Sequence, residues 1–179
     1  VAGHVPREVF APCGAAAFYR RDAFEMHGGF DSNFFCYIED LDLGLRMVAA
    51  GAHCLLVPEA RLSHVGSATL GAQHDFIWFH SYRNTLWMLV RSLPLCLLLI
   101  VLPAHATARG YLFWRTRKQV GHDARRRGWR AGWAGIWPAF CSRRGGVARR
   151  SRHVWPWLVW SPAKLRGNAL HMRAPRRQE

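Results

Sequence analysis

Apolar residues recur at intervals of three and four in two segments of the first half of the chain, and this spacing predicts helices. The first segment spans residues 39–50, and its apolar positions are Leu41, Leu45 and Val48. Gly51 follows it and is expected to end the helix, because glycine is common just beyond a helix C-terminus. The second segment spans residues 76–91, with apolar positions Trp78, Tyr82 and Leu86.

Shorter elements are expected before and between these helices. Residues 53–57 are predicted to form a strand that stops at Pro58, because proline cannot donate to a sheet ladder. Asp22 is expected to begin a compact helical turn that ends at Gly28-Gly29. The first half of the chain should therefore contain both strand and helix.

The pattern changes in residues 92–108, which contain no charged residue and are bounded by Arg91 and Arg109. As a helix this run would be about 25 Å long, which is short of the ~30 Å hydrocarbon core of a bilayer. A re-entrant or interfacial segment is therefore predicted. A tight crossing that extends into residues 111–113 is the alternative.

A second membrane-directed pattern follows this run. Tryptophan recurs at four-residue intervals, and arginines flank it; the tryptophans are Trp129, Trp133 and Trp137, and the arginines are Arg125, Arg126, Arg127 and Arg130. This pattern is typical of a basic helix that lies at a membrane interface. The last twenty residues are expected to be poorly ordered.

Charge divides the chain in the same place. Residues 1–90 carry six basic and nine acidic residues, and residues 91–179 carry nineteen basic and two acidic ones. The second half therefore has a formal charge of +17 and is expected to meet an anionic partner, either a membrane surface or nucleic acid. No nucleic-acid-binding motif is present, and the uncharged run would have no role in such a module.

The cysteines indicate the redox compartment of the protein, and the first residue indicates whether the chain is part of a longer one. The five cysteines are an odd number without a C-x-x-C pair, and this pattern predicts neither a disulfide framework nor a zinc site. A reducing cytoplasm fits best. The chain begins at Val1 without an initiator methionine or a leader, and it is expected to be part of a longer protein.

One ordered set of motifs carries the chemistry. It consists of Gly28-Gly29-Phe30-Asp31, Tyr37-Ile38-Glu39-Asp40-Leu41-Asp42-Leu43, Arg46, Gly51, His64 and Arg83-Asn84. This set resembles the second half of family-two inverting nucleotide-sugar glycosyltransferases, especially the bacterial rhamnosyltransferase-like enzymes, over residues 10–115. The resemblance implies an α/β chain, namely the C-terminal portion of a GT-A fold with a largely parallel mixed sheet, followed by membrane-associated helices.

The resemblance assigns the catalytic base to Asp40 and places Glu39 beside the acceptor site. A base is needed because the acceptor hydroxyl must lose a proton as it attacks the donor sugar. The alternative is that these carboxylates only favour a helix N-terminus. Asp40-Leu41-Asp42 also spells D-x-D, but residues two apart on a helix diverge, so Asp42 is expected to pair with Arg46 instead.

The resemblance also suggests ligands for substrate and metal. His64 is expected to complete a divalent metal site (Mg or Mn) whose other ligands come from an upstream D-x-D that this chain lacks; the alternative is a loop histidine bonded to backbone. Cys13, Gly14 and Ala15 would lie near the donor sugar, or would serve tight packing. Arg83 and Asn84 would contact phosphate or order the acceptor loop, unless Arg83 lies on a helix surface.

Three segments are therefore expected: the acceptor-side part of a catalytic domain in residues 1–91, membrane-associated helices in residues 92–140, and a basic tail in residues 141–179. The predicted function is inverting transfer of a sugar, rhamnose by resemblance, from a nucleotide-diphosphate donor to a lipid-linked or cell-surface glycan. The site of action would be the cytoplasmic face of the bacterial inner membrane, with peripheral or re-entrant attachment. The alternatives are a Trp/Arg-rich nucleic-acid-binding module and a catalytically inactive membrane-associated remnant.

Overall fold

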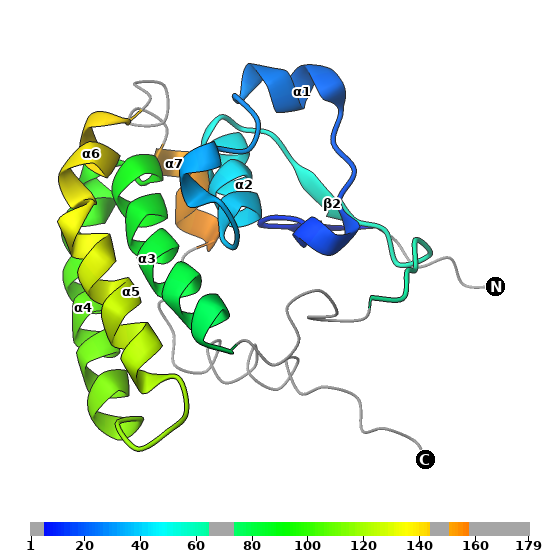
Figure 1. Cartoon of the computed structure of the whole chain (residues 1–179). Helices are drawn as coiled ribbons and strands as arrows, with labels where there is room; N and C mark the ends of the chain where they lie inside the picture. Colours follow the sequence, from blue (N-terminus) through cyan, green and yellow to red (C-terminus); the bar gives the residue numbers. More distant parts are fainter. Residues whose placement is uncertain (1–5, 65–73, 144–150, 158–179) are drawn as a thin grey trace, which may run out of the picture.

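The computed structural model describes residues 6–64, 74–143 and 151–157, and helices dominate them (Figure 1). The elements of the first half are β1 (Arg7–Val9), η1 (Gly14–Ala16), α1 (Arg21–Met26), η2 (Ser32–Phe34), α2 (Glu39–Ala49) and β2 (Cys54–Leu56). Those of the second half are α3 (His74–Ser92), α4 (Leu95–Arg115), α5 (His122–Ala134), α6 (Ile136–Cys141), α7 (Ser151–Val154) and η4 (Trp155–Trp157).

The sheet has two strands in the described residues, and it differs from the expected one. β1 and β2 pair antiparallel, with Arg7 opposite Leu56 and Val9 opposite Cys54. The strand predicted at residues 53–57 is therefore confirmed as β2, but the prediction of a largely parallel sheet is not met by these strands. Two strands of three residues each cannot bury a sheet face, so helices supply nearly all of the core.

The two periodic segments form the helices that their spacing predicts. α2 ends at Ala49, one residue before the predicted end at Ala50, and Gly51 follows with a positive φ of 88°. Leu45 and Val48 are buried as expected, whereas Leu41 is 36% exposed. α3 begins two residues before the predicted start and buries Tyr82 and Leu86.

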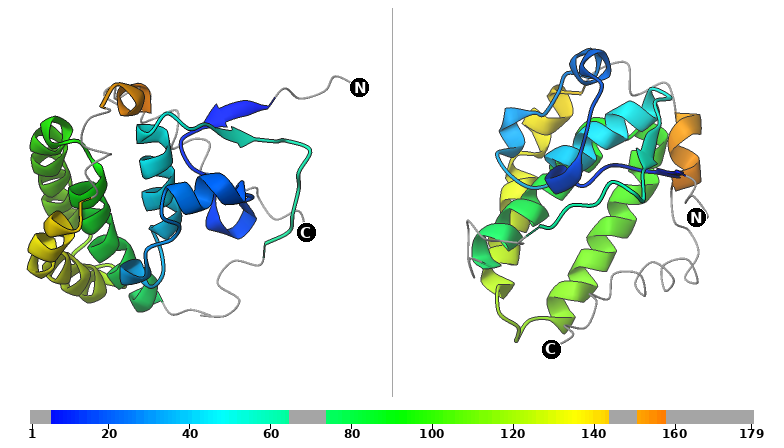
Figure 2. Two further views of the ribbon diagram at one scale, coloured as in Figure 1. Left: turned by 90° about the horizontal axis from the view of Figure 1, so that it is seen from above. Right: turned by 90° about the vertical axis from the view of Figure 1, so that its right-hand side faces the viewer.

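One hydrophobic core joins the two halves of the chain. Its buried members come from α2, α3, α4, α6 and α7 and from the α3–α4 junction: Leu45, Ala49, Leu89, Val90, Leu93, Leu97, Leu98, Ala139 and Val154. Figure 1 shows α3 to α6 gathered on one side of this core and α1, α2 and the two strands on the other, and Figure 2 shows the same division from two further directions. The core is thus continuous across residue 91.

Small residues set the close approach of α5 to α3. A Cβ added at Gly128 would lie 2.3 Å from the backbone oxygen of Phe79, and one added at Gly132 would lie 3.1 Å from the Leu86 side chain. The Trp87 indole N–H also donates to the Gly132 carbonyl at 3.0 Å. Glycine at these positions therefore lets the two helix backbones approach closely.

Gly128→Ala is expected to destabilise the protein by about 1–3 kcal/mol, because the added methyl group must push two helix backbones apart. Gly110→Ala on α4 is the matched control: a Cβ there meets nothing within 4 Å, and alanine should stabilise the helix by about 0.5–1 kcal/mol. Urea unfolding curves measure both. A Gly128→Ala protein as stable as the wild type would contradict this packing.

The tryptophan pattern predicted as one helix is divided between two, so that prediction is wrong. α5 ends at Ala134 and α6 begins at Ile136, with Gly135 between them. A side chain at Gly135 would lie 2.5 Å from the Trp87 ring, so the chain turns where it passes that indole. Trp129 lies on the inner side of α5, where its ring contacts His105 and Phe113.

The apolar run forms a longer helix than the uncharged residues alone predicted. α4 contains 21 residues, starts after Pro94 and continues through Arg109 to Arg115. At ~1.5 Å per residue its length is about 31 Å. By length and composition it is the described helix that could cross a membrane.

Part of the predicted basic tail packs on the body of the protein. Val154 of α7 is buried, and the rings of Trp157 and Phe10 lie 5.9 Å apart. The His153 ring lies close to Gly51, just beyond α2. The prediction of disorder for the last twenty residues falls outside the described residues.

Candidate functional site

The Asp40 carboxylate is held by two backbone N–H groups at the start of α2. Gly14 N–H donates to Oδ2 at 2.8 Å, and Leu41 N–H donates to Oδ1 at 2.7 Å. A Cβ on Gly14 would lie 3.2 Å from the same Oδ2, so the residue without a side chain permits the close approach. Each carboxylate oxygen retains a further lone pair, so Asp40 can still accept a proton.

The loop that leads into Asp40 is strained. Phe35, Tyr37 and Ile38 all have positive φ, at 62°, 66° and 74°. Phe35 is the centre of a three-residue turn in which Cys36 N–H donates to the Phe34 carbonyl at 2.7 Å. A positive φ is unfavourable for a β-branched residue such as Ile38, and such strain clusters at functional sites.

Asn84 of α3 holds this strained loop in place. Its side chain is buried, and its Nδ2 donates to the carbonyls of Phe34, Cys36 and Tyr37 at 2.8–2.9 Å. Its Oδ1 accepts from Arg83 Nε at 2.8 Å, and Arg83 Nη2 also donates to the Phe34 carbonyl at 3.0 Å. Of the roles predicted for Arg83 and Asn84, these bonds match the ordering of the loop.

A buried ion pair fixes α2 beneath the loop. Arg46 and Asp42 lie 2.8 Å apart with their side chains 5% and 0% exposed, so the predicted pairing is confirmed. Ser92 Oγ donates to the other Asp42 oxygen at 2.7 Å. Arg46 also donates to the carbonyls of His27 and Gly29 and thereby fastens the Gly28-Gly29 turn. Asp42 is thus engaged in structure rather than in metal binding.

Arg91 is a third anchor on α3, and it lies outside the sequence motifs that predict the site. Its Nη2 lies 2.5 Å from Asp31 Oδ2, and its guanidinium lies over the Phe34 ring. Burial alone would raise the pKa of Asp31, but the hydrogen bonds from Arg91 and Asn33 outweigh it and lower that pKa. Arg91 is seven residues beyond Asn84, so helical spacing from that residue could have found it.

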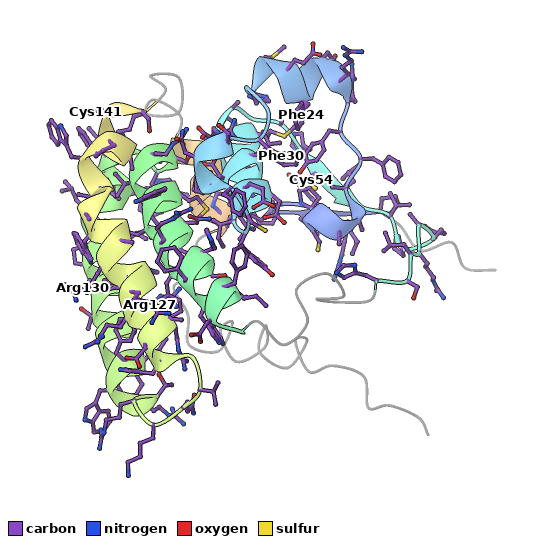
Figure 3. The ribbon with its side chains drawn as sticks, in the orientation of Figure 1. Phe24, Phe30, Cys54, Arg127, Arg130 and Cys141 are labelled. Carbon is purple, nitrogen blue, oxygen red and sulfur yellow. The ribbon has the colours of Figure 1, made fainter. Side chains whose placement is uncertain are left out.

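Aromatic rings and a phenol lie near the two carboxylates. Tyr19, Phe24 and Phe30 form a cluster with ring centroids 5.2–5.9 Å apart, and Figure 3 labels the two phenylalanines. Burial raises the pKa of Tyr19 to about 12, and the charges of Asp40, Cys54 and Glu39 act in the same direction. Tyr19 therefore remains a neutral hydrogen-bond donor beside the acidic pair.

Glu39 precedes Asp40, and one of its carboxylate oxygens differs from those of Asp40 in having no hydrogen-bond partner in the part of the chain that the structure describes. Its Oε2 atom is buried and has no hydrogen-bond partner among the described residues, and the same is true of the Tyr19 hydroxyl. A buried carboxylate oxygen and a buried phenol without partners are costly unless another group satisfies them. A hydroxyl group that reached both atoms would supply the missing partners.

The small-residue segment lies beside the base. Cys13 and Ala15 are exposed in or next to η1, as is Gly14. The alternative of tight packing applies to Gly14, whose backbone approaches Asp40, and to Ala11, whose methyl group would lie 2.4 Å from a Cβ on Gly44. Cys13 and Ala15 remain accessible to a ligand.

His64 is exposed and is the last described residue before the gap at residues 65–73. In the part of the chain that the structure describes, no three His, Cys, Asp or Glu side chains are grouped so as to hold a metal ion. The residues present do not form a metal site by themselves. A metal ion at His64 would need its other ligands from elsewhere.

The basic cluster of α5 divides into buried and exposed members. Arg125 is buried: it donates to the carbonyls of Val120 and Gly121 and lies over the Trp78 ring. Arg126, Arg127 and Arg130 are exposed, and Figure 3 labels the last two on α5. Of the two tryptophans on this helix, Trp129 is turned inward and Trp133 is 40% exposed.

Comparison with known proteins relates the chain to glycosyltransferases through a partial match. It is 45% identical over 51 residues to N-acetylglucosaminyl-diphospho-decaprenol L-rhamnosyltransferase from two strains of Mycobacterium tuberculosis. The match covers 28% of this chain and 17% of each relative. No family model matches, and no solved structure matches. The match supports a transferase role at the general level.

Proposed function

We propose that this chain carries the acceptor side of an inverting glycosyltransferase of the GT-A, family-two type. The observation that carries the proposal is the Asp40 carboxylate, which Gly14 and Leu41 N–H groups hold at the end of a strained, tightly anchored loop. The partial match to rhamnosyltransferases supports the same class of reaction.

In the proposed reaction Asp40 is the general base. As the acceptor oxygen attacks the anomeric carbon of the donor, Asp40 takes the hydroxyl proton, and the bond to the nucleoside diphosphate breaks on the opposite side. A single displacement inverts the anomeric carbon. The two backbone donors orient the carboxylate, and Glu39 and Tyr19 would bind neighbouring hydroxyl groups of the acceptor.

The proposed substrates follow the names of the relatives. Those names indicate an L-rhamnosyl group and an N-acetylglucosaminyl-diphospho-lipid acceptor. We propose a nucleoside-diphosphate sugar, rhamnose in the first instance, as donor and a lipid-linked glycan as acceptor. Exposed Cys13 and Ala15 would face the donor sugar, with Gly14 between them, and Arg83 and Asn84 would act through the loop that they hold.

A divalent metal is proposed as a cofactor to which this chain contributes at most His64. The metal, Mg or Mn, would offset charge on the leaving diphosphate. Donor binding should then weaken in chelator, and undiminished binding would remove His64 as a ligand.

The proposed place of action is the cytoplasmic face of the bacterial inner membrane, where a lipid-linked acceptor is available. The +17 charge of residues 91–179 suits an anionic leaflet, since each basic residue near such a surface contributes about 1 kcal/mol. Nucleic acid is a less suitable partner because the sequence carries no nucleic-acid-binding motif and the uncharged run of residues 92–108 would have no role in such a module.

The direct test is transfer of radiolabelled rhamnose from its nucleoside diphosphate into a lipid-extractable product. The protein is expressed from its complete reading frame, with a lipid-linked N-acetylglucosamine acceptor and Mg²⁺ or Mn²⁺ present. Labelled product above that of a heat-inactivated control is expected. Its absence with rhamnose and with other nucleoside-diphosphate sugars would favour the inactive remnant.

A further inference from the structure

The outer face of α4 carries no charged side chain before Arg115, the last residue of the helix. Exposed positions recur along the helix from its start to the residue before Arg115: Leu95, Cys96, Leu99, Ile100, Pro103, Ala104, Thr107, Ala108, Gly110, Tyr111, Leu112 and Trp114. Leu99 is 77% exposed and Trp114 is 65% exposed. Such a face without a partner in the described structure is a binding surface for something apolar.

The inner face of α4 is attached to the protein at both ends. Leu97 and Leu98 lie in the core shared with α2 and α3, and the Phe113 ring contacts Tyr82 and Trp129. Arg109 is the charged residue in the middle of α4, and its guanidinium carbon lies 4.2 Å from the centroid of the Tyr82 ring on this same inner side. The body of the protein therefore covers one side of α4 over its length and leaves the other side open.

The arginines of the neighbouring helix α5 make a bilayer crossing by α4 unfavourable. α5 lies near α4 through the contacts of Trp129 with His105 and Phe113, and it carries exposed Arg126, Arg127 and Arg130. If α4 crossed the bilayer in this arrangement, α5 would enter with it and place those arginines in hydrocarbon. Charged side chains are costly there.

The C-terminal end of α4 has the composition of an interface. Tyr111 and Trp114 are exposed, and the cations Arg115, Arg117 and Lys118 follow within four residues. Aromatic rings with a polar edge and long basic side chains gather at the level of lipid headgroups. The occupant that fits the whole face is therefore the surface of an anionic bilayer.

We propose that α4 lies in the plane of the membrane surface, with its uncharged outer face among the upper acyl chains and Arg115, Arg117 and Lys118 at the anionic headgroups. This inference specifies how the proposed membrane partner is bound, and it does not require sugar transfer. It holds the Asp40 side of the protein in water beside the bilayer, where the headgroup of a lipid-linked acceptor projects.

The test measures the depth of nitroxide labels on single-cysteine proteins bound to vesicles of equal parts phosphatidylglycerol and phosphatidylcholine. The labels are placed at native Cys96 and at Ile100→Cys, Ala104→Cys, Thr107→Cys, Tyr111→Cys and Trp114→Cys. All six positions are exposed, so the labels should not disturb packing. Native Cys13, which is exposed and directly precedes η1, serves as the reference in water.

An in-plane helix gives one shallow depth, about 5–10 Å below the phosphates, at all six positions. A maximum of about 15 Å near residues 104–107 would indicate a crossing helix and overturn the inference while leaving the membrane partner intact. Failure of the unlabelled protein to bind the vesicles would overturn both. Loss of sugar transfer with a uniform shallow depth would affect only the proposed activity.

A charge substitution provides an independent measurement. Leu99→Glu should weaken vesicle binding by about tenfold or more, whereas Leu62→Glu, also an exposed leucine but outside α4, should bind as the wild type does. If Leu99→Glu leaves vesicle binding unchanged but converts a dimer into a monomer in sedimentation, the face binds a second copy of the chain and the inference is wrong.

Discussion

Asp40→Asn is expected to lower the rate of sugar transfer by about 10²–10⁴-fold, the contribution typical of a positioned general base. The amide oxygen can still accept a hydrogen bond from Gly14 or Leu41, so the local structure should persist. The amide cannot take up the acceptor proton, and the loss should therefore appear in kcat. Donor affinity should change little.

A matched control is Asp123→Asn, because Asp123 is the second residue of α5 just as Asp40 is the second residue of α2. Its carboxylate is exposed and far less constrained, and its substitution should leave the rate unchanged. Steady-state transfer assays and donor binding by calorimetry separate the two effects. An Asp40→Asn protein with full activity would remove Asp40 from the role of base.

Arg46→Met is expected to destabilise the protein by about 3–5 kcal/mol, as removal of one partner of a buried ion pair does. The substitution leaves the fully buried Asp42 carboxylate with Ser92 as its remaining side-chain partner. It also deprives the His27 and Gly29 carbonyls of a donor. Urea unfolding followed by circular dichroism measures the change.

Arg21→Met is the control for this pair. Arg21 and Glu25 also form an i,i+4 ion pair at 2.8 Å, but their side chains are 91% and 61% exposed. Exposed pairs contribute less than about 1 kcal/mol. Equal stability of the Arg46→Met and Arg21→Met proteins would show that burial of the Asp42–Arg46 pair has no energetic consequence.

Much of the site follows from local sequence, because the interactions are local. The i,i+4 spacing of Asp42 and Arg46 predicts their pairing, and Gly51 predicts the end of α2. The strain at Phe35, Tyr37 and Ile38 could not be predicted, since nothing in those residue types favours a positive φ. It exists because Asn84, nearly fifty residues later, binds the loop carbonyls.

The errors beyond residue 91 have a common physical cause. The uncharged run predicts a segment bounded by Arg109, with an extension into residues 111–113 as the alternative; Arg109 lies over the Tyr82 ring, and α4 continues past it to Arg115. The tryptophan spacing predicted one helix, but Trp87 of α3 lies where a side chain at residue 135 would extend. Both outcomes depend on aromatic contacts between helices, which the periodicity of one segment does not reveal.

The site and the proposed membrane surface share one helix. α3 supplies Asn84 and Arg91 to the loop before the base, and its Tyr82 contacts both Phe113 and Arg109 of α4. In the proposed membrane-bound state, the position of Asp40 relative to the bilayer would therefore be set by helix packing rather than by a linker. This geometry suits an enzyme whose acceptor is anchored in lipid.

If Asp40 activates the acceptor for a single displacement, the stereochemistry of the product records that displacement. The measurement is the anomeric configuration of the newly formed glycosidic bond, determined by NMR and compared with that of the nucleoside-diphosphate donor. A single displacement gives the opposite configuration. A product that retains the donor's configuration would contradict it.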